Sequence, residues 1–268
     1  MKCELFNDHF QNYKRYGIPK AQLVIADIPY NLGKNAYASS TEWYVDGDSK
    51  KGESDKANKA FFDTDENFRI AEFMHFCSKM LIKEPKEKGK APCMVVFCAF
   101  QQLEMVIEYG RQHGFKGHIP LVFIKKTSPQ VLKANMKIVG ATEYALVLYR
   151  DKLPKFNNDG RMVLNWFHWE TDNSYPKIHP TQKPVPILKQ LIEIFTDAGD
   201  VVIDPCAGSG STLRAAAELN RNAFGFEIKK RYVPESKRRN ALEYSDWIVD
   251  LNRGSIKSVL ITLTQPIK

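Results

Sequence analysis

The stretch GDVVIDPCAGSGSTLRAAAELNRNAFGFEI, residues 199–228, constrains the fold more than any other part of the sequence. Its apolar residues Val201 to Ile203 predict a buried strand that ends at Asp204, and Gly208-Ser209-Gly210 predicts a tight turn into a helix. A second short strand then ends at Glu227. This order of strand, glycine turn, helix and strand indicates a parallel unit with a ligand at the carboxyl end of its first strand.

The rest of the chain repeats this alternation of strands and helices. Apolar residues at helical spacing predict one helix over residues 70–81, a shorter one near residues 103–107, and a third that starts at Pro186. Short apolar runs predict buried strands at Leu23–Ala26, Met94–Cys98, Leu121–Ile124, Tyr144–Tyr149, Val201–Ile203 and Ala223–Phe226. We therefore predict an α/β fold with a doubly wound, mainly parallel sheet in a single domain, residues 1–268.

The glycine turn differs from the common phosphate-binding loops. Leu213 stands where a dinucleotide fingerprint requires a third glycine, and Ser211-Thr212 stands where a P-loop requires a lysine. Glu227 is an acid that can accept hydrogen bonds from ribose hydroxyls. A glycine turn and a ribose-binding acid without a diphosphate site suit S-adenosylmethionine, although a plain strand–turn–helix has the same pattern.

A second short stretch, QLVIADIPYNLG at residues 22–33, joins a buried-looking strand directly to polar and aromatic residues. Asp27, Ile28, Pro29 and Tyr30 follow one another where this strand ends. Open α/β sheets bind their ligands at such strand ends, so the tetrapeptide is a candidate site. An Asp-Pro turn without a ligand is the alternative.

Composition narrows the choice of partner and compartment. The formal net charge of +8 and the pI near 9.1 favour a polyanionic partner such as nucleic acid. The five cysteines show no spacing typical of a zinc site, so we expect reduced thiols and no metal. The sequence contains neither a signal-peptide pattern nor an apolar run of membrane-spanning length, and we expect a cytoplasmic protein.

Two stretches interrupt the alternation of strands and helices. Residues 31–68 include a highly charged run that predicts either a surface loop or a mobile loop beside the site at Asp27. Residues 152–178 mix aromatic residues, among them Trp166 and Trp169, with polar ones. We interpret this second stretch as a small target-recognition insert.

Taken together, the motifs resemble a known family. The residues from His179, HPTQKP, followed by DPCAGSGST, are similar to the C-terminal half of amino-type DNA methyltransferases of the permuted, beta-type motif order. Asp27-Ile28-Pro29-Tyr30 resembles their Asp-Pro-Pro-Tyr motif, and the resemblance covers about residues 4–240. It implies a seven-stranded S-adenosylmethionine-dependent methyltransferase sheet that acts on double-stranded DNA.

The resemblance also implies roles for individual residues. Asp27 and the Ile28 carbonyl would accept the hydrogens of a base amine, Tyr30 would stack on the base, and Pro29 would stiffen the turn. Asp204 with the glycine turn would hold the methionine part of the cofactor, Glu227 its ribose, and Asp8 its adenine amino group. The implied cofactor set is Asp8, Asp27, Thr181, Lys183, Asp204, Cys206, Ala207, Gly208, Ser209, Gly210 and Glu227, in which Thr181 and Lys183 would lie near the cofactor carboxylate.

Departures from the family pattern keep alternatives open. Ile28 replaces the first proline of the tetrapeptide, although its backbone carbonyl remains. Aspartate at position 27 favours adenine N6 as the target, and N4 of cytosine is the alternative, with serine often found there in the family. A catalytically inactive DNA-binding subunit of the same fold is a further alternative. No restriction partner is visible, and the compact size fits a stand-alone modifying enzyme from a phage or other mobile element, acting alone or as a homodimer.

Overall fold

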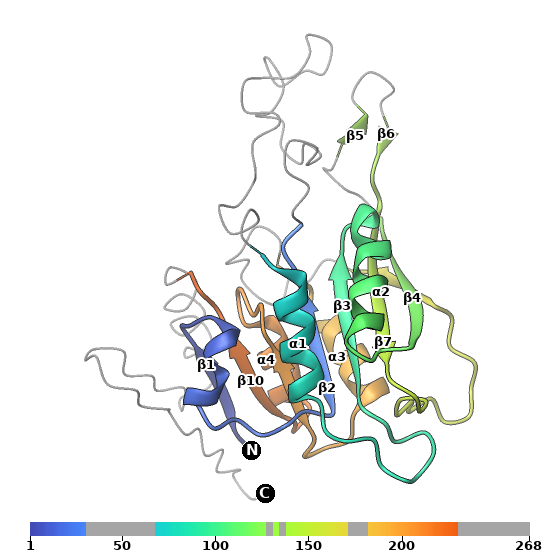
Figure 1. The fold of residues 1–268 in the computed structure, drawn as a ribbon. Helices are drawn as coiled ribbons and strands as arrows, with labels where there is room; N and C mark the ends of the chain where they lie inside the picture. The colour runs from blue at the N-terminus through green and yellow to red at the C-terminus, as the bar shows by residue number, and fades with distance from the viewer. Residues whose placement is uncertain (31–67, 127–130, 134–137, 171–181, 230–268) are drawn as a thin grey trace, which may run out of the picture.

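The computed structural model describes residues 1–30, 68–126, 131–133, 138–170 and 182–229 (Figure 1). Its centre is one eight-stranded sheet. Across this sheet the strands follow the order β1 (Cys3–Phe6), β10 (Asn222–Phe226), β9 (Val201–Asp204), β2 (Leu23–Asp27), β3 (Cys93–Cys98), β7 (Thr142–Tyr149), β4 (Gly117–Lys125) and β8 (Trp166–Trp169). A separate two-stranded ribbon pairs β5 (Val131–Lys133) with β6 (Ile138–Val139).

The sheet is mainly parallel, as predicted. Neighbouring strands from β1 to β3 are parallel, and only β7 runs against its neighbours β3 and β4. The central strand β2 lies between β3, which follows it in the chain, and β9, which comes much later. The strand order therefore reverses beside β2. Doubly wound folds bind their ligands at such a reversal, outside the carboxyl ends of the strands.

Helices cover both faces of the sheet. One face packs against α1 (Ile70–Met80), α2 (Leu103–Gln112) and the 3-10 helix η1 (Phe10–Arg15), and the other packs against α3 (Val185–Phe195) and α4 (Ser211–Glu218) (Figure 1). Strand β3 shows why two cores form, since its residues alternate between them. A second 3-10 helix, η6 (Phe100–Gln102), connects β3 to α2.

The number of strands differs from the expected seven, because part of the stretch assigned to target recognition is a sheet strand. Residues Trp166–Trp169 form β8, which pairs in parallel with β4 at the sheet edge. The ring of Phe167 stacks on that of Phe123 at 5.3 Å between centroids. The remainder of 152–178 keeps its proposed recognition role as a prediction, and residues 171–178 lie outside the described residues. So do residues 31–67 of the predicted mobile loop.

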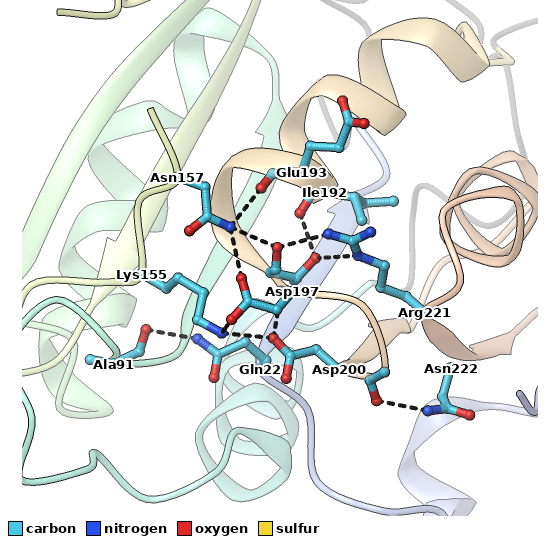
Figure 2. A network of polar contacts seen from close by, with 12 residues as sticks. Gln22, Ala91, Lys155, Asn157, Ile192, Glu193, Asp197, Asp200, Arg221 and Asn222 are labelled. Atoms are coloured by element: carbon cyan, nitrogen blue, oxygen red, sulfur yellow. Dashed lines mark hydrogen bonds and ion pairs between the residues drawn. The ribbon is translucent and has the colours of Figure 1, made fainter. Parts of the chain in front are cut away.

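A polar network lies at the end of the sheet where the parallel strands β2, β9 and β10 begin (Figure 2). The Lys155 ammonium lies 2.7 Å from a carboxylate oxygen of Asp197 and 3.0 Å from one of Asp200. Asn157 donates to the backbone carbonyl of Thr196 at 2.9 Å, and Arg221 donates to the same carbonyl at 2.9 Å. The network joins the segment after β7 to the connection between α3 and β9. This is the edge opposite the predicted site.

In the part of the chain that the structure describes, no helix is long and apolar enough to cross a membrane.

Candidate active site

The predicted tetrapeptide lies at the carboxyl edge of the central strands. Asp27 is the last residue of β2 and pairs in register with Phe97 of β3. The Ile28 N–H donates to the Phe97 carbonyl at 3.1 Å, and the side-chain amide of Gln102 donates to the Pro29 carbonyl at 3.0 Å. These two bonds fix the backbone of the tetrapeptide from the neighbouring strand and from η6.

The departure at Ile28 has a structural reason. The Ile28 side chain is buried in the core on the α1 side of the sheet, and its N–H extends the β2–β3 ladder by one residue. A proline has no N–H and could not make this bond. Isoleucine therefore keeps the backbone carbonyl that the proposed chemistry needs and adds a hydrogen bond that typically contributes about 0.5–1.5 kcal/mol.

The two carboxylate oxygens of Asp27 have different environments. Oδ2 lies 2.6 Å from the Lys183 ammonium. Oδ1 is buried and has no hydrogen-bond partner among the described residues. Burial raises the pKa of Asp27, and the charge of Lys183 opposes this shift. An unpaired buried carboxylate oxygen at a strand end is ready to accept a hydrogen bond from a ligand.

Lys183 lies within this site, two residues before α3. Its ammonium is buried, lies 3.3 Å from Oε2 of Glu143, and is 5.9 Å from the centroid of the Tyr30 ring and 5.6 Å from that of Trp169. Burial alone would lower the Lys183 pKa, but the carboxylates of Asp27 and Glu143 outweigh it, and the pKa is raised. Lys183 is therefore a permanent cation beside Asp27.

Glu143 and Lys125 belong to the same cluster, and our sequence analysis did not identify either. Glu143 is the second residue of β7, and it forms an ion pair with Lys125, the last residue of β4. Burial raises the Glu143 pKa, but Lys183 and Lys125 together lower it. The sequence carries one signal that we missed, which is a lone acid at the start of an otherwise apolar strand.

Tyr30 remains a neutral phenol in this setting. Burial, followed by the charges of Asp27 and Glu143, raises its pKa well above the ordinary value. A neutral phenol ring at the end of a strand can stack on a flat aromatic ligand without the negative charge of a phenolate.

The glycine turn lies at the neighbouring strand end. Gly208 and Gly210 both have positive φ, at 49° and 78°, and Gly210 caps the start of α4. The Glu227 carboxylate accepts the N–H of Gly208 at 2.9 Å and that of Lys229 at 2.7 Å. Among the described residues, no atom lies within 4 Å of where a Cβ on Gly208 would stand, so these residues leave the turn open on that side.

Leu213, which excluded the dinucleotide fingerprint, has a packing partner. A Cβ on Gly225 of β10 would come within 2.7 Å of the Leu213 side chain and 3.0 Å of the Ala207 Cβ. The glycine that permits close packing of helix and strand thus lies on the strand instead of the helix. The backbone N–H of Ala207 donates to the Phe226 carbonyl at 2.9 Å and fixes the start of the turn.

Asp204 is a buried acid at the end of β9. Its Oδ1 accepts the N–H of Cys206 at 2.9 Å. Burial raises the pKa of Asp204 to about 7, against the opposing hydrogen bonds from Thr212 and Cys206. The carboxyl therefore changes charge near neutral pH in the ligand-free protein.

Asp8 follows β1 and is held by its own surroundings. Its oxygens accept the Asn12 amide at 2.7 Å and the Tyr16 hydroxyl at 2.7 Å. Burial would raise the Asp8 pKa, but these bonds and the His9 N–H outweigh it and lower the pKa. A carboxylate has room for about four hydrogen bonds, so Asp8 retains capacity for a ligand donor.

The four acids form a row. Strands β1, β10, β9 and β2 are neighbours in the sheet, and an acid stands at or just after the carboxyl end of each one. In that order the acids are Asp8, Glu227, Asp204 and Asp27. A ligand that fits this edge carries positive charge and several hydrogen-bond donors, because the edge offers acceptors and an open glycine turn.

Three residues of the predicted cofactor set remain to be placed, namely Cys206, Ser209 and Thr181. Cys206 and Ser209 lie on the turn itself, and the Ser209 hydroxyl is 2.8 Å from that of Ser211. Thr181 lies outside the described residues. Among the residues described, there is no cluster of histidines, cysteines and acids that could hold a metal ion.

The chain is similar to known proteins along most of its length. A protein family described as DNA methylase matches residues 21–238 of the chain. The DNA adenine methyltransferase YhdJ of Escherichia coli (strain K12) is 23% identical over 263 aligned residues, which cover 89% of this chain and 82% of that protein.

Two solved structures share the fold. The M1.HpyAVI–SAM complex has a TM-score of 0.64 at 21% identity and covers 88% of this chain and 98% of its own. The cytosine-N4-specific PvuII DNA methyltransferase has a TM-score of 0.65 at 15% identity, with 95% of this chain and 89% of its own covered.

Proposed function

The chain belongs to the DNA methylase family of amino-methylating (N6/N4) DNA methyltransferases, and from this premise we propose that it methylates the N6 amine of adenine in double-stranded DNA. The observation that carries the proposal is the unpaired, buried Oδ1 of Asp27, next to a row of acids suited to a cationic cofactor. The methyl donor of the reaction is S-adenosylmethionine.

The residues at the sheet edge fit this cofactor. S-adenosylmethionine supplies an electrophilic methyl group, and it carries a sulfonium, an ammonium, two ribose hydroxyls and an adenine amine. Glu227 can accept a ribose hydroxyl, because a carboxylate has about four acceptor sites and the backbone N–H groups of Gly208, Ile228 and Lys229 do not fill them all. Asp204, beside the turn at Gly208, would hold the methionine part, and Asp8 would accept a hydrogen bond from the adenine amine.

The chain prepares the amine of the target base for attack. An amine on adenine is a weak nucleophile, since its lone pair is delocalised into the ring. Oδ1 of Asp27 and the Ile28 carbonyl accept the two amine hydrogens and direct the lone pair out of the ring plane. Alignment of this kind can supply roughly 7 to 11 kcal/mol of the barrier. Tyr30 stacks on the base and holds its plane.

The target base must leave the duplex to reach Asp27, at a cost of about a few kcal/mol. Stacking on aromatic rings recovers roughly 1–3 kcal/mol per base. Phe100, the first residue of η6 and two residues after β3, offers such a ring, because 65% of its surface is exposed. It contacts the ring of Tyr144 at 5.4 Å between centroids and is joined to the tetrapeptide through Gln102 of the same 3-10 helix.

N4 methylation of cytosine is the second candidate. The shared fold of the cytosine-N4-specific PvuII enzyme favours keeping it, and the amine chemistry at Asp27 would be the same. Aspartate at position 27 favours adenine, and so does the similarity to the adenine methyltransferase YhdJ.

The test is transfer of a labelled methyl group from S-adenosylmethionine to unmethylated duplex DNA, followed by digestion to nucleosides and chromatography. We expect the label in N6-methyl-2′-deoxyadenosine. Label in N4-methyl-2′-deoxycytidine would replace the adenine assignment with the second candidate. Absence of label in DNA of varied sequence, with cofactor binding intact, would overturn methyl transfer and leave an inactive DNA-binding subunit.

A further inference from the structure

The active-site cluster contains more charged groups than the proposed reaction uses. Asp27, Lys183, Glu143 and Lys125 form a chain of ion pairs in which the sign of the charge alternates. They come from β2, the segment before α3, β7 and β4, and no side chain is more than 27% exposed. The four formal charges sum to zero.

Stability alone does not explain why these four charges are buried together. Burying charges removes their hydration, and apolar residues of similar volume often stabilise a core as well or better. The reaction, however, needs Asp27 ionised, with one oxygen free and fixed in direction. Lys183 favours the ionised form and binds Oδ2, but a long lysine side chain with a single partner could also swing toward Oδ1.

Glu143 removes this freedom. Its Oε2 lies 3.3 Å from the Lys183 ammonium, so carboxylates from two different strands, Asp27 of β2 and Glu143 of β7, hold the ammonium. Lys125 in turn holds Glu143, and the Trp169 ring lies within 6 Å of both lysine ammoniums. Glu143 acts on Asp27 through Lys183, and its charge also raises the Asp27 pKa directly.

We infer that Glu143 is a positioning residue for methyl transfer: it holds Lys183 on Oδ2 of Asp27, so that Oδ1 stays free for the amine of the target base. The inference rests on the proposed function. It assigns to Glu143 no contact with the base or the cofactor.

The cluster predicts opposite effects of its two neighbours on Asp27. Burial raises the Asp27 pKa, Lys183 and Lys125 lower it, and Glu143 raises it. Tyr30, Cys98, Cys206 and Asp204 also face Asp27, and the Asp27 charge raises the pKa of each of them. Removing the Glu143 charge should lower the Asp27 pKa, whereas removing the Lys183 charge should raise it. An exposed charge away from the cluster should leave the Asp27 pKa unchanged.

The experiment compares Glu143→Gln with wild type and with Glu108→Gln, which makes the same change on the exposed surface of α2. We expect the single-turnover rate of Glu143→Gln to fall at least tenfold at neutral pH, with cofactor affinity within twofold of wild type. The acid limb of its pH–rate profile should move to lower pH. Wild-type rates, or a loss of rate without any shift of the limb, would overturn the inference.

Two further measurements keep the test independent of folding and of the proposed function. If Glu143→Gln does not fold, Glu143→Asp retains the charge on a shorter side chain, and the rate should then fall while the limb stays in place; a wild-type rate would overturn the inference. If wild type methylates no DNA, the proposed function fails. Carboxyl NMR titration of Asp27 in both proteins still decides the geometry, since an unchanged Asp27 pKa in Glu143→Gln contradicts the positioning role.

Discussion

The Lys183 ammonium lies 2.6 Å from Oδ2 of Asp27, although 156 residues separate the two in the chain. The resemblance to the amino-type methyltransferases led us to expect Lys183 near the cofactor carboxylate. In the structure Lys183 pairs with Asp27, and its proposed cofactor contact remains a prediction. The pair joins the segment before α3 to the end of β2, and the Lys183 charge lowers the pKa of Asp27.

Replacing Lys183 tests which of these two roles dominates. Lys183→Met removes the charge that opposes burial at Asp27, so the Asp27 pKa should rise and the acid limb of the pH–rate profile should move to higher pH. We expect a rate loss of tenfold or more near pH 7 that is partly recovered at pH 9. The measurement is the pH–rate profile with Lys79→Met, on the exposed side of α1, as the control. A loss of cofactor affinity at an unchanged pH profile would favour the cofactor role.

The ionised Asp204 carboxylate should lower the stability of the fold and favour cofactor binding. Its folded pKa of about 7 lies above the unfolded value near 3.8, so folding favours the protonated form. Stability should therefore fall as the pH rises from about 4 to about 7 and stay lower above that. Asp204→Asn should raise the melting temperature by several degrees at pH 8, change it little at pH 4, and weaken cofactor binding. Calorimetry at both pH values checks this, and equal shifts at the two would contradict it.

Ile28→Pro should restore the family tetrapeptide at a cost in stability. The variant loses the hydrogen bond to the Phe97 carbonyl and part of a buried side chain, but keeps the backbone carbonyl at position 28. We expect a melting temperature lower by roughly 2–6 °C and a methylation rate within about threefold of wild type. A rate that rises strongly would indicate that isoleucine impairs the reaction.

Phe100 should matter for DNA and not for the cofactor. Phe100→Ser removes an exposed ring beside the site, and we expect about tenfold weaker binding to duplex DNA at fixed salt. The matched control is Phe156→Ser, because Phe156 is also exposed but packs on Phe195 at the end of α3, at the opposite edge of the sheet. Equal losses in the two variants would argue against a stacking role.

Much of the architecture could be predicted from local patterns. The runs at Leu23, Met94 and Val201 form strands because each is apolar on both faces, and such runs need a sheet covered by helices on both sides. Pro186 lies in the first turn of α3, where a proline needs no hydrogen-bond partner. The glycine turn and the acids Asp27, Asp204 and Glu227 could be identified because each adjoins a predicted strand, whereas Asp8 came from the family resemblance alone.

The rest depends on contacts that no local pattern encodes. Glu143 and Lys125 lie in different strands and meet each other because β7 pairs with β4, and Glu143 meets Lys183 only in the folded protein. Trp166–Trp169 resembled a polar insert because four residues are too few to show alternation, and pairing with β4 decides their structure. Ile28 could be identified as a departure from the motif, but its extra hydrogen bond follows from the register of β2 and β3.

The role of Asp27 in methyl transfer is tested most directly by the single-turnover rate of Asp27→Asn on duplex DNA. Asp151→Asn makes the same change at an exposed site after β7 and serves as the control. We expect Asp27→Asn to lose roughly 10²–10³ in rate, as enzymes do on losing one preorganised catalytic hydrogen bond, and still to bind S-adenosylmethionine. Methylation by Asp27→Asn at the rate of the Asp151→Asn control would contradict this role.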